Sequence, residues 1–134
     1  MTPATHLPPS WARHLLIVLG CPIDLEKLRF LNAWARAEGG DAIWNPLNTT
    51  FELPGTTDYN STGVKNYPRP IWGIAATALT LTSPAMGPLR YAKILGHLQA
   101  RAGSNTAEQI LEACLDDLQA WGTDPDLLRR VLAS

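Results

Sequence analysis

A long stretch with few helical signals, Asp41–Pro70, interrupts a chain that is otherwise typical of successive helices. It is rich in Asn, Thr, Gly and Pro, with aromatic residues interleaved. Its only strand-like runs are Thr49–Leu53 and Val64–Tyr67, and the Pro54-Gly55 pair between them is a turn signal. We therefore expect a small irregular β-lobe, between about residues 42 and 68, inserted into a mainly α (α+β) fold.

Helical segments are expected on both sides of this stretch. They are Trp11–Leu19 (capped by Ser10), Asp24–Glu38, Ile71–Leu81, Leu89–Arg101, Thr106–Trp121 and Asp126–Leu132. Capping residues, glycine stops and apolar spacing define their ends and faces. The near-continuous apolarity of Ile71–Leu81 predicts that it is a buried central helix with the others around it. Residues 1–9 are expected to form an extended N-terminal lead-in to a single domain that spans residues 1–134.

Composition narrows the function classes. A chain of 134 residues with 46% hydrophobic content suits one compact core. A formal net charge of -1 argues against a nucleic-acid-binding surface. Cys21 and Cys114 lie far apart, without a CxxC motif or a neighbouring His, so we expect buried free thiols, no metal and no cofactor. The Leu15–Leu19 run is too short to span a membrane, and we expect a protein made in the cytoplasm without a signal peptide.

Glu38 is the most informative single residue, because it ends a predicted helix just before Gly39-Gly40. Stepping about 100° per residue places it in the apolar stripe, opposite Arg29 and Arg36. The residues that share its face are Leu28, Leu31, Trp34 and Ala35. Partial burial and the negative end of the helix dipole both raise a carboxyl pKa. Glu38 is therefore a candidate general acid, the alternative being a solvated acid in a terminal turn.

Four runs carry a resemblance to a known family: AEGG, WNPLNTT, PGTTDYNSTGVKNYP and WGIAATALTL. They resemble a domain of phage and prophage cell-wall-degrading proteins, which is related to goose-type lysozymes and lytic transglycosylases. In that lysozyme-like superfamily the catalytic glutamate ends a helix, and a small polar β-lobe and then a buried helix follow. The resemblance covers about Phe30 to Gly122 and places Glu38 at the glutamate position. The AWGTD run at Ala120–Asp124 is similar to the family's end of domain.

The resemblance directs attention to the polar residues of the lobe. Asp58 is the best candidate for a second catalytic carboxylate, and the alternative is an ordinary Asx-turn residue. Asn and Thr side chains could hydrogen-bond sugar hydroxyls or satisfy loop backbone, and Tyr rings could stack on sugars or pack in the core. The candidate substrate-binding residues are Asn45, Asn48, Thr49, Thr50, Tyr59, Asn60 and Tyr67.

The activity that the resemblance implies is cleavage of the β-1,4 bond between N-acetylmuramic acid and N-acetylglucosamine in peptidoglycan. Glu38 would protonate the glycosidic oxygen, in a phage or prophage lysin or a virion-associated lysozyme that acts on the cell wall. Inverting hydrolysis, retaining hydrolysis and transglycosylation all remain open. The expected partners are peptidoglycan glycan strands, with no nucleic acid and no membrane.

Two non-enzymatic alternatives remain. The first is a virion or prophage structural or glycan-binding protein that keeps a lysozyme-like fold, with other virion proteins as partners. The modest net charge and the lack of a wall-binding repeat favour this alternative. The second is a helical adaptor that binds a partner through an exposed Trp11 or Trp121.

Overall fold

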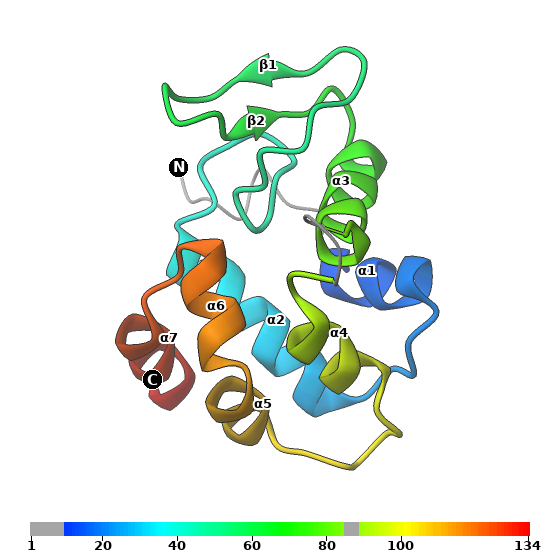
Figure 1. Cartoon of the computed structure of the whole chain (residues 1–134), viewed down its shortest axis with the longest axis vertical. Coiled ribbons are helices and arrows are strands. Elements are labelled where there is room, and N and C mark those ends of the chain that lie inside the picture. The colour runs from blue at the N-terminus through cyan, green and yellow to red at the C-terminus, as the bar shows by residue number, and fades with distance from the viewer. Residues whose placement is uncertain (1–9, 85–88) are drawn as a thin grey trace.

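The computed structural model describes residues 10–84 and 89–134, and within them the fold is mainly α, with seven helices and one small hairpin (Figure 1). In chain order the elements are α1 (Trp11–Leu19), α2 (Leu25–Glu38), β1 (Thr57–Asp58), β2 (Lys65–Asn66), α3 (Pro70–Thr82), α4 (Ala92–Gln99), α5 (Ala107–Ala113), α6 (Leu115–Trp121) and α7 (Pro125–Ala133). The lead-in expected at residues 1–9 lies outside the described residues. The mainly α class with a small β-lobe is confirmed.

The hairpin is smaller than the sequence predicts and is shifted along the chain. β1 pairs antiparallel with β2, with Asp58 opposite Lys65. The predicted Val64–Tyr67 run contains β2, and Pro54-Gly55 does form a turn, closed by a bond from the Thr56 N–H to the Leu53 carbonyl. The strand predicted at Thr49–Leu53 is wrong. Thr49 makes one backbone bond to β2, since its carbonyl accepts from the Lys65 N–H at 3.2 Å, but the Asn45 side chain also binds that carbonyl and the Thr49 N–H, and no strand forms there.

α2 is the helix that the others enclose. It packs against α1, α5 and α7, and its Phe30, Leu31 and Trp34 are fully buried in a core cluster shared with the other helices. α4, α5, α6 and α7 lie around it in Figure 1. This arrangement gives the end of α2, and so Glu38, a fixed place beside the lobe.

α3 is not the buried central helix that its apolarity predicts. It packs against α1 and α4, while Ile71, Trp72 and Leu79 are 56%, 38% and 41% exposed. The lobe lies against another part of α3, where Gly73 meets the backbone carbonyl of Trp44. Ile74 and Leu81 on the other face of α3 are buried in the core, so α3 is a partly exposed helix at the edge of the core.

The predicted helix ends are mostly confirmed. Asp24 caps α2 by accepting a bond from the Lys27 N–H at 2.8 Å, and Thr106 caps α5 in a capping box with Gln109. Asp124 caps α7, with Pro125 at its first position. Ser10 precedes α1 but makes no side-chain capping bond, so that prediction is wrong.

The helix predicted over Thr106–Trp121 is two helices, because the chain turns at Cys114. The turn sets α6 at an angle to α5 (Figure 1). Asp117 on α6 then accepts bonds from the backbone N–H groups of Lys93 and Ile94, which it caps at the start of α4. The turn at Cys114 therefore lets Asp117 on α6 reach the start of α4. The spacing of apolar residues in the sequence does not reveal this contact.

Three further expectations have structural outcomes. Cys21 and Cys114 are buried free thiols, as predicted. Trp11 is only 3% exposed, so it offers no adaptor surface. Across residues 10–84 and 89–134, no helix has the length and apolarity needed to cross a membrane.

Candidate active site

Glu38 lies where the sequence places it, on the last residue of α2. Gly39 ends the helix with a φ of 90°, a left-handed value that favours glycine, and its N–H bonds to the Arg36 carbonyl at 3.2 Å. Trp34 on the same face is buried, whereas Arg36 is exposed. The Glu38 residue is half-buried, so it lies beside the core and keeps some exposure to solvent.

Two side chains from distant parts of the chain hold the Glu38 carboxyl. The Thr123 hydroxyl, in the loop between α6 and α7, donates to Glu38 Oε2 at 2.8 Å. Trp34 Nε1 in turn donates to Thr123 Oγ1 at 2.8 Å. From the lobe, Asn48 Nδ2 donates to the Glu38 backbone carbonyl at 2.7 Å and lies 3.3 Å from Oε1. Hydrogen bonds from the lobe and from the loop before α7 therefore hold the Glu38 carboxyl in place.

Burial raises the pKa of Glu38 above its ordinary value. The hydrogen bonds from Thr123 and Asn48 oppose this rise, because they stabilise the charged form, but burial has the larger effect. The direction of the shift is the one predicted from the helical face. An additional rise from the helix dipole, the second cause expected from the sequence, stays a prediction.

An aromatic cluster of Trp34, Trp121 and Tyr91 packs beside the residues that hold Glu38. The Trp34 and Trp121 rings meet edge to face with centroids 5.1 Å apart, and Tyr91 packs on Trp121 at 5.0 Å. Trp121 Nε1 donates to the Leu47 carbonyl at 2.7 Å. Because Leu47 immediately precedes Asn48, this bond fixes the segment of the lobe that reaches Glu38.

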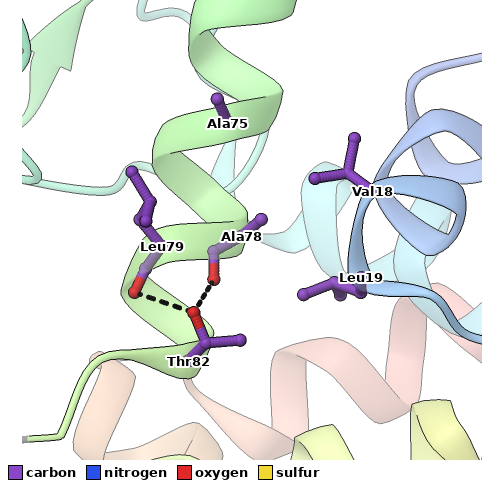
Figure 2. A pocket seen from close by; sticks show the side chains of 6 residues that line it. All are labelled: Val18, Leu19, Ala75, Ala78, Leu79 and Thr82. Carbon is purple, nitrogen blue, oxygen red and sulfur yellow. Dashed lines mark hydrogen bonds between the residues drawn. The ribbon is translucent and has the colours of Figure 1, made fainter.

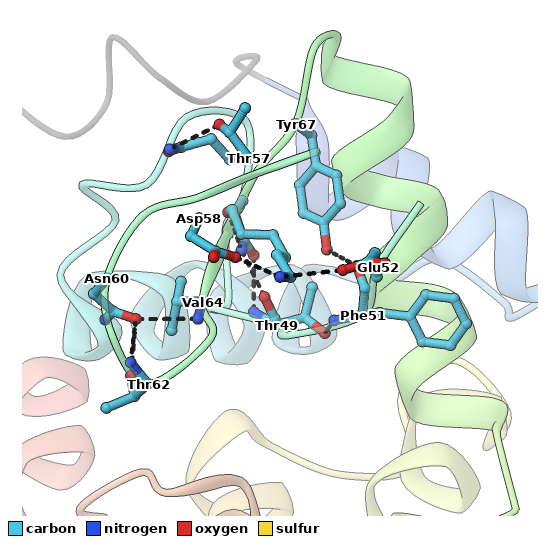
Figure 3. Close-up of polar contacts among 12 residues, drawn as sticks. Thr49, Phe51, Glu52, Thr57, Asp58, Asn60, Thr62, Val64 and Tyr67 are labelled. Carbon is cyan, nitrogen blue, oxygen red and sulfur yellow. Dashed lines mark hydrogen bonds and ion pairs between the residues drawn. The ribbon is translucent and has the colours of Figure 1, made fainter. Parts of the chain in front are cut away.

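Three of the predicted binding residues are buried and serve the lobe itself. Asn45 bonds to the backbone of Thr49 and to the Lys65 carbonyl. The Thr49 hydroxyl lies 2.5 Å from that of Thr80 on α3. The Tyr67 hydroxyl donates to the Phe51 carbonyl at 2.5 Å (Figure 3). This burial matches the alternative that the sequence left open, in which these side chains satisfy loop backbone and core.

The remaining lobe candidates are at the surface. Thr50, Asp58, Tyr59 and Asn60 are exposed. Asn60 Oδ1 accepts bonds from the backbone N–H groups of Thr62 and Val64, which closes the hairpin tip (Figure 3). Of the predicted binding residues, Asn48 is the one that the described structure joins to Glu38 by hydrogen bonds.

Asp58 takes part in an ion pair rather than in the Glu38 network. Its Oδ1 lies 2.5 Å from Lys65 Nζ, which is also 3.4 Å from Glu52. This pairing raises the pKa of Lys65, and the hydrogen bond that Lys65 donates to Asp58 is the main cause. Because the Asp58 side chain is largely open to solvent, water and salt screen this pair and it contributes little to stability.

If the protein has the wall-lysing activity that the family resemblance implies, we expect Asp58→Asn to change both the melting temperature and the rate of lysis little, with the rate within about threefold of wild type, because the surface pair contributes so little. Lysis of purified cell walls, followed by turbidity, measures the rate. A loss of tenfold or more with an intact fold would instead identify Asp58 as the second catalytic group.

Sequence reasoning missed Thr123 and its link to Trp34. The AWGTD run that contains Thr123 was recognised only as the end of the domain. A Thr that follows a helix-ending Gly, next to an N-cap Asp, is an ordinary loop residue by local pattern. Only the packing of the loop before α7 against the end of α2 brings its hydroxyl to Glu38.

A separate apolar cavity of about 390 Å³ lies between α1 and α3 (Figure 2). Its lining residues are Val18, Leu19, Ala75, Ala78, Leu79 and Thr82. None of these side chains can act as an acid or a base near neutral pH, so this cavity is not the candidate active site. Within the described ranges, no three His, Cys, Asp or Glu side chains gather as a metal site.

No protein-family model, curated protein or solved structure matches this chain. The clues to function are therefore the carboxyl of Glu38 and the side chains that hold it. A half-buried acid with a raised pKa, fixed by two donors beside a polar lobe, can deliver a proton to a bound substrate.

Proposed function

We propose that this protein cleaves the glycan strands of peptidoglycan, with Glu38 as the general acid. The observation that carries the proposal is the state of the Glu38 carboxyl, which is half-buried, raised in pKa and held by Thr123 and Asn48. Glycosidic bonds are cleaved with the help of a carboxylic acid whose raised pKa keeps a proton available for the leaving oxygen.

The order of the elements supports a lysozyme-like fold as part of this proposal. A helix ends at the acid, a small polar hairpin lobe follows, and α3 comes next. The family resemblance implies this order of elements, with the glutamate at the position of Glu38, although the helix after the lobe, α3, is partly exposed rather than buried. The substrate would be the β-1,4 bond between N-acetylmuramic acid and N-acetylglucosamine, attacked by a phage or prophage lysin or by an enzyme carried in a virion.

The reaction begins as Glu38 gives its proton to the glycosidic oxygen while positive charge develops on the sugar carbon. The oxygen of water, in hydrolysis, or of the muramic acid 6-hydroxyl, in transglycosylation, then bonds to that carbon and releases its proton, and Glu38 takes up a proton again before the next cycle. The exposed lobe residues Thr50, Tyr59 and Asn60 are proposed to contact the sugars. Asn45, Thr49 and Tyr67 are proposed to keep the lobe in shape.

The pH dependence of lysis tests this proposal. Activity should fall as the pH rises through the pKa of Glu38, because the carboxylate has no proton to give. Since burial raises that pKa, the fall should come at a higher pH than an ordinary carboxyl would produce. The measurement is the initial rate of wall lysis against pH, beside a ¹³C NMR titration of the Glu38 side chain. A rate that stays constant while Glu38 loses its proton would contradict the proposal.

A further inference from the structure

We propose that Thr123 is a positioning residue that orients the Glu38 carboxyl and reserves one of its oxygens, Oε1, for the proton. The inference deepens the proposed function and rests on it. It starts from two hydrogen bonds in series, from Trp34 to Thr123 and from Thr123 to Glu38, each 2.8 Å long.

The chemistry of the three groups sets the direction of these bonds. An indole N–H can only donate, so the Thr123 oxygen must accept from Trp34. Among the described residues, the Thr123 hydroxyl has Glu38 Oε2 as its one other partner. Thr123 is buried at 4% exposure, so a hydroxyl hydrogen without an acceptor would be costly there. The hydroxyl therefore donates to Oε2.

Oε1 is left as the oxygen that carries the acidic proton. Oε2 already receives a hydrogen from Thr123, and a second hydrogen on it would meet the first. Asn48 Nδ2 lies 3.3 Å from Oε1 but 2.7 Å from the Glu38 backbone carbonyl, so its main bond is to the backbone. Protonation at Oε1 therefore disturbs only the longer, 3.3 Å bond from Asn48, while the bond from Thr123 to Oε2 keeps the carboxyl in one orientation.

Charged side chains have little influence on the pKa of Glu38. The charged residues nearest to Glu38 and Thr123 in sequence are Arg36 on α2, Asp41 at the start of the lobe and Asp124 at the cap of α7, and all three are exposed. Within residues 10–84 and 89–134, the causes of the Glu38 shift are burial and the bonds from Thr123 and Asn48, with no charged side chain among them. The Thr123 hydroxyl is therefore the group whose removal changes Glu38 most cleanly.

The experiment compares Thr123→Val with Thr123→Ser. Val keeps the shape of Thr but removes the donor that favours the charged form, so the pKa of Glu38 should rise above its wild-type value. The alkaline fall in lysis rate should move to higher pH, and the maximal rate should drop about tenfold because the carboxyl is free to turn. Ser restores the hydroxyl, so Glu38 should titrate as in wild type. Unchanged titration in Thr123→Val, or an equal shift in both variants, would overturn the inference.

A second measurement needs no substitution at Thr123. Such a measurement is useful because Thr123→Val also leaves the buried Trp34 indole N–H without an acceptor, and this lowers the stability of that variant. In the unsubstituted protein, the Trp34 indole N–H resonance should shift with pH at the midpoint of the Glu38 titration, and Glu38→Gln should abolish that shift. An indole resonance that stays constant through the titration would overturn the inference. Both NMR readouts are independent of lysis, so they separate a failure of the Thr123 role from a failure of the proposed activity.

Discussion

Glu38→Gln is expected to abolish wall lysis, a loss of about a hundredfold to ten-thousandfold, the range that general acid catalysis contributes. The amide has nearly the shape of the acid but has no proton to give to a leaving oxygen. Its oxygen can still accept the Thr123 hydroxyl, so the melting temperature should stay within a few degrees of wild type. Turbidity loss of purified walls and thermal melting measure the two effects.

Asp41→Asn is the matched control for this substitution. It makes the same acid-to-amide change three positions further along, at an exposed side chain. We expect lysis and stability close to wild type. If Glu38→Gln lysed walls at nearly the same rate as Asp41→Asn, Glu38 would have no part in the mechanism.

Gly73→Ala is expected to have the largest effect on stability. A methyl group at this buried position of α3 would overlap the carbonyl oxygen of Trp44 and lie 2.7 Å from its carbonyl carbon. Those atoms are backbone and cannot turn aside as a side chain does. We expect a loss of about 3 kcal/mol in unfolding free energy, the upper end of the range for overpacking. Lysis should also fall, because the displaced segment leads into Asn48.

Gly96→Ala is the control for the glycine substitution. Gly96 is exposed on α4, and a methyl group there would meet nothing within 4 Å. Alanine is favoured over glycine in a helix by about 0.5–1 kcal/mol, so this variant should be slightly more stable than wild type. Denaturant unfolding of both variants measures the difference. Equal stabilities would show that α3 and the lobe do not meet as closely as the structure has them.

Local patterns were enough to locate the acid. Helical periodicity placed Glu38 in the stripe of Leu31 and Trp34, Gly39 marked the end of the helix, and Asp24 marked its start. Each of these signals is read within one or two turns of chain. The same is true of the capping box at Thr106, and all of them are confirmed.

Contacts between distant parts of the chain were beyond such patterns. Thr123 lies 85 residues from Glu38, and no spacing rule connects them. The burial of Asn45 in the lobe is equally invisible, because a polar loop residue is normally exposed. The exposed apolar side chains of α3 were equally hard to predict, because the composition of a helix shows how apolar it is but not which other elements cover it.

Analysis of the products from purified peptidoglycan is the most direct test of glycan cleavage by Glu38. Wild-type protein should create new glycan ends, detected by mass spectrometry as reducing-end fragments after hydrolysis or as anhydro fragments lighter by one water after transglycosylation. Glu38→Gln, folded and at the same concentration, should create neither. New ends made equally by both proteins would remove Glu38 from the reaction. No new ends from folded wild-type protein would contradict the activity and favour a non-enzymatic virion or glycan-binding protein.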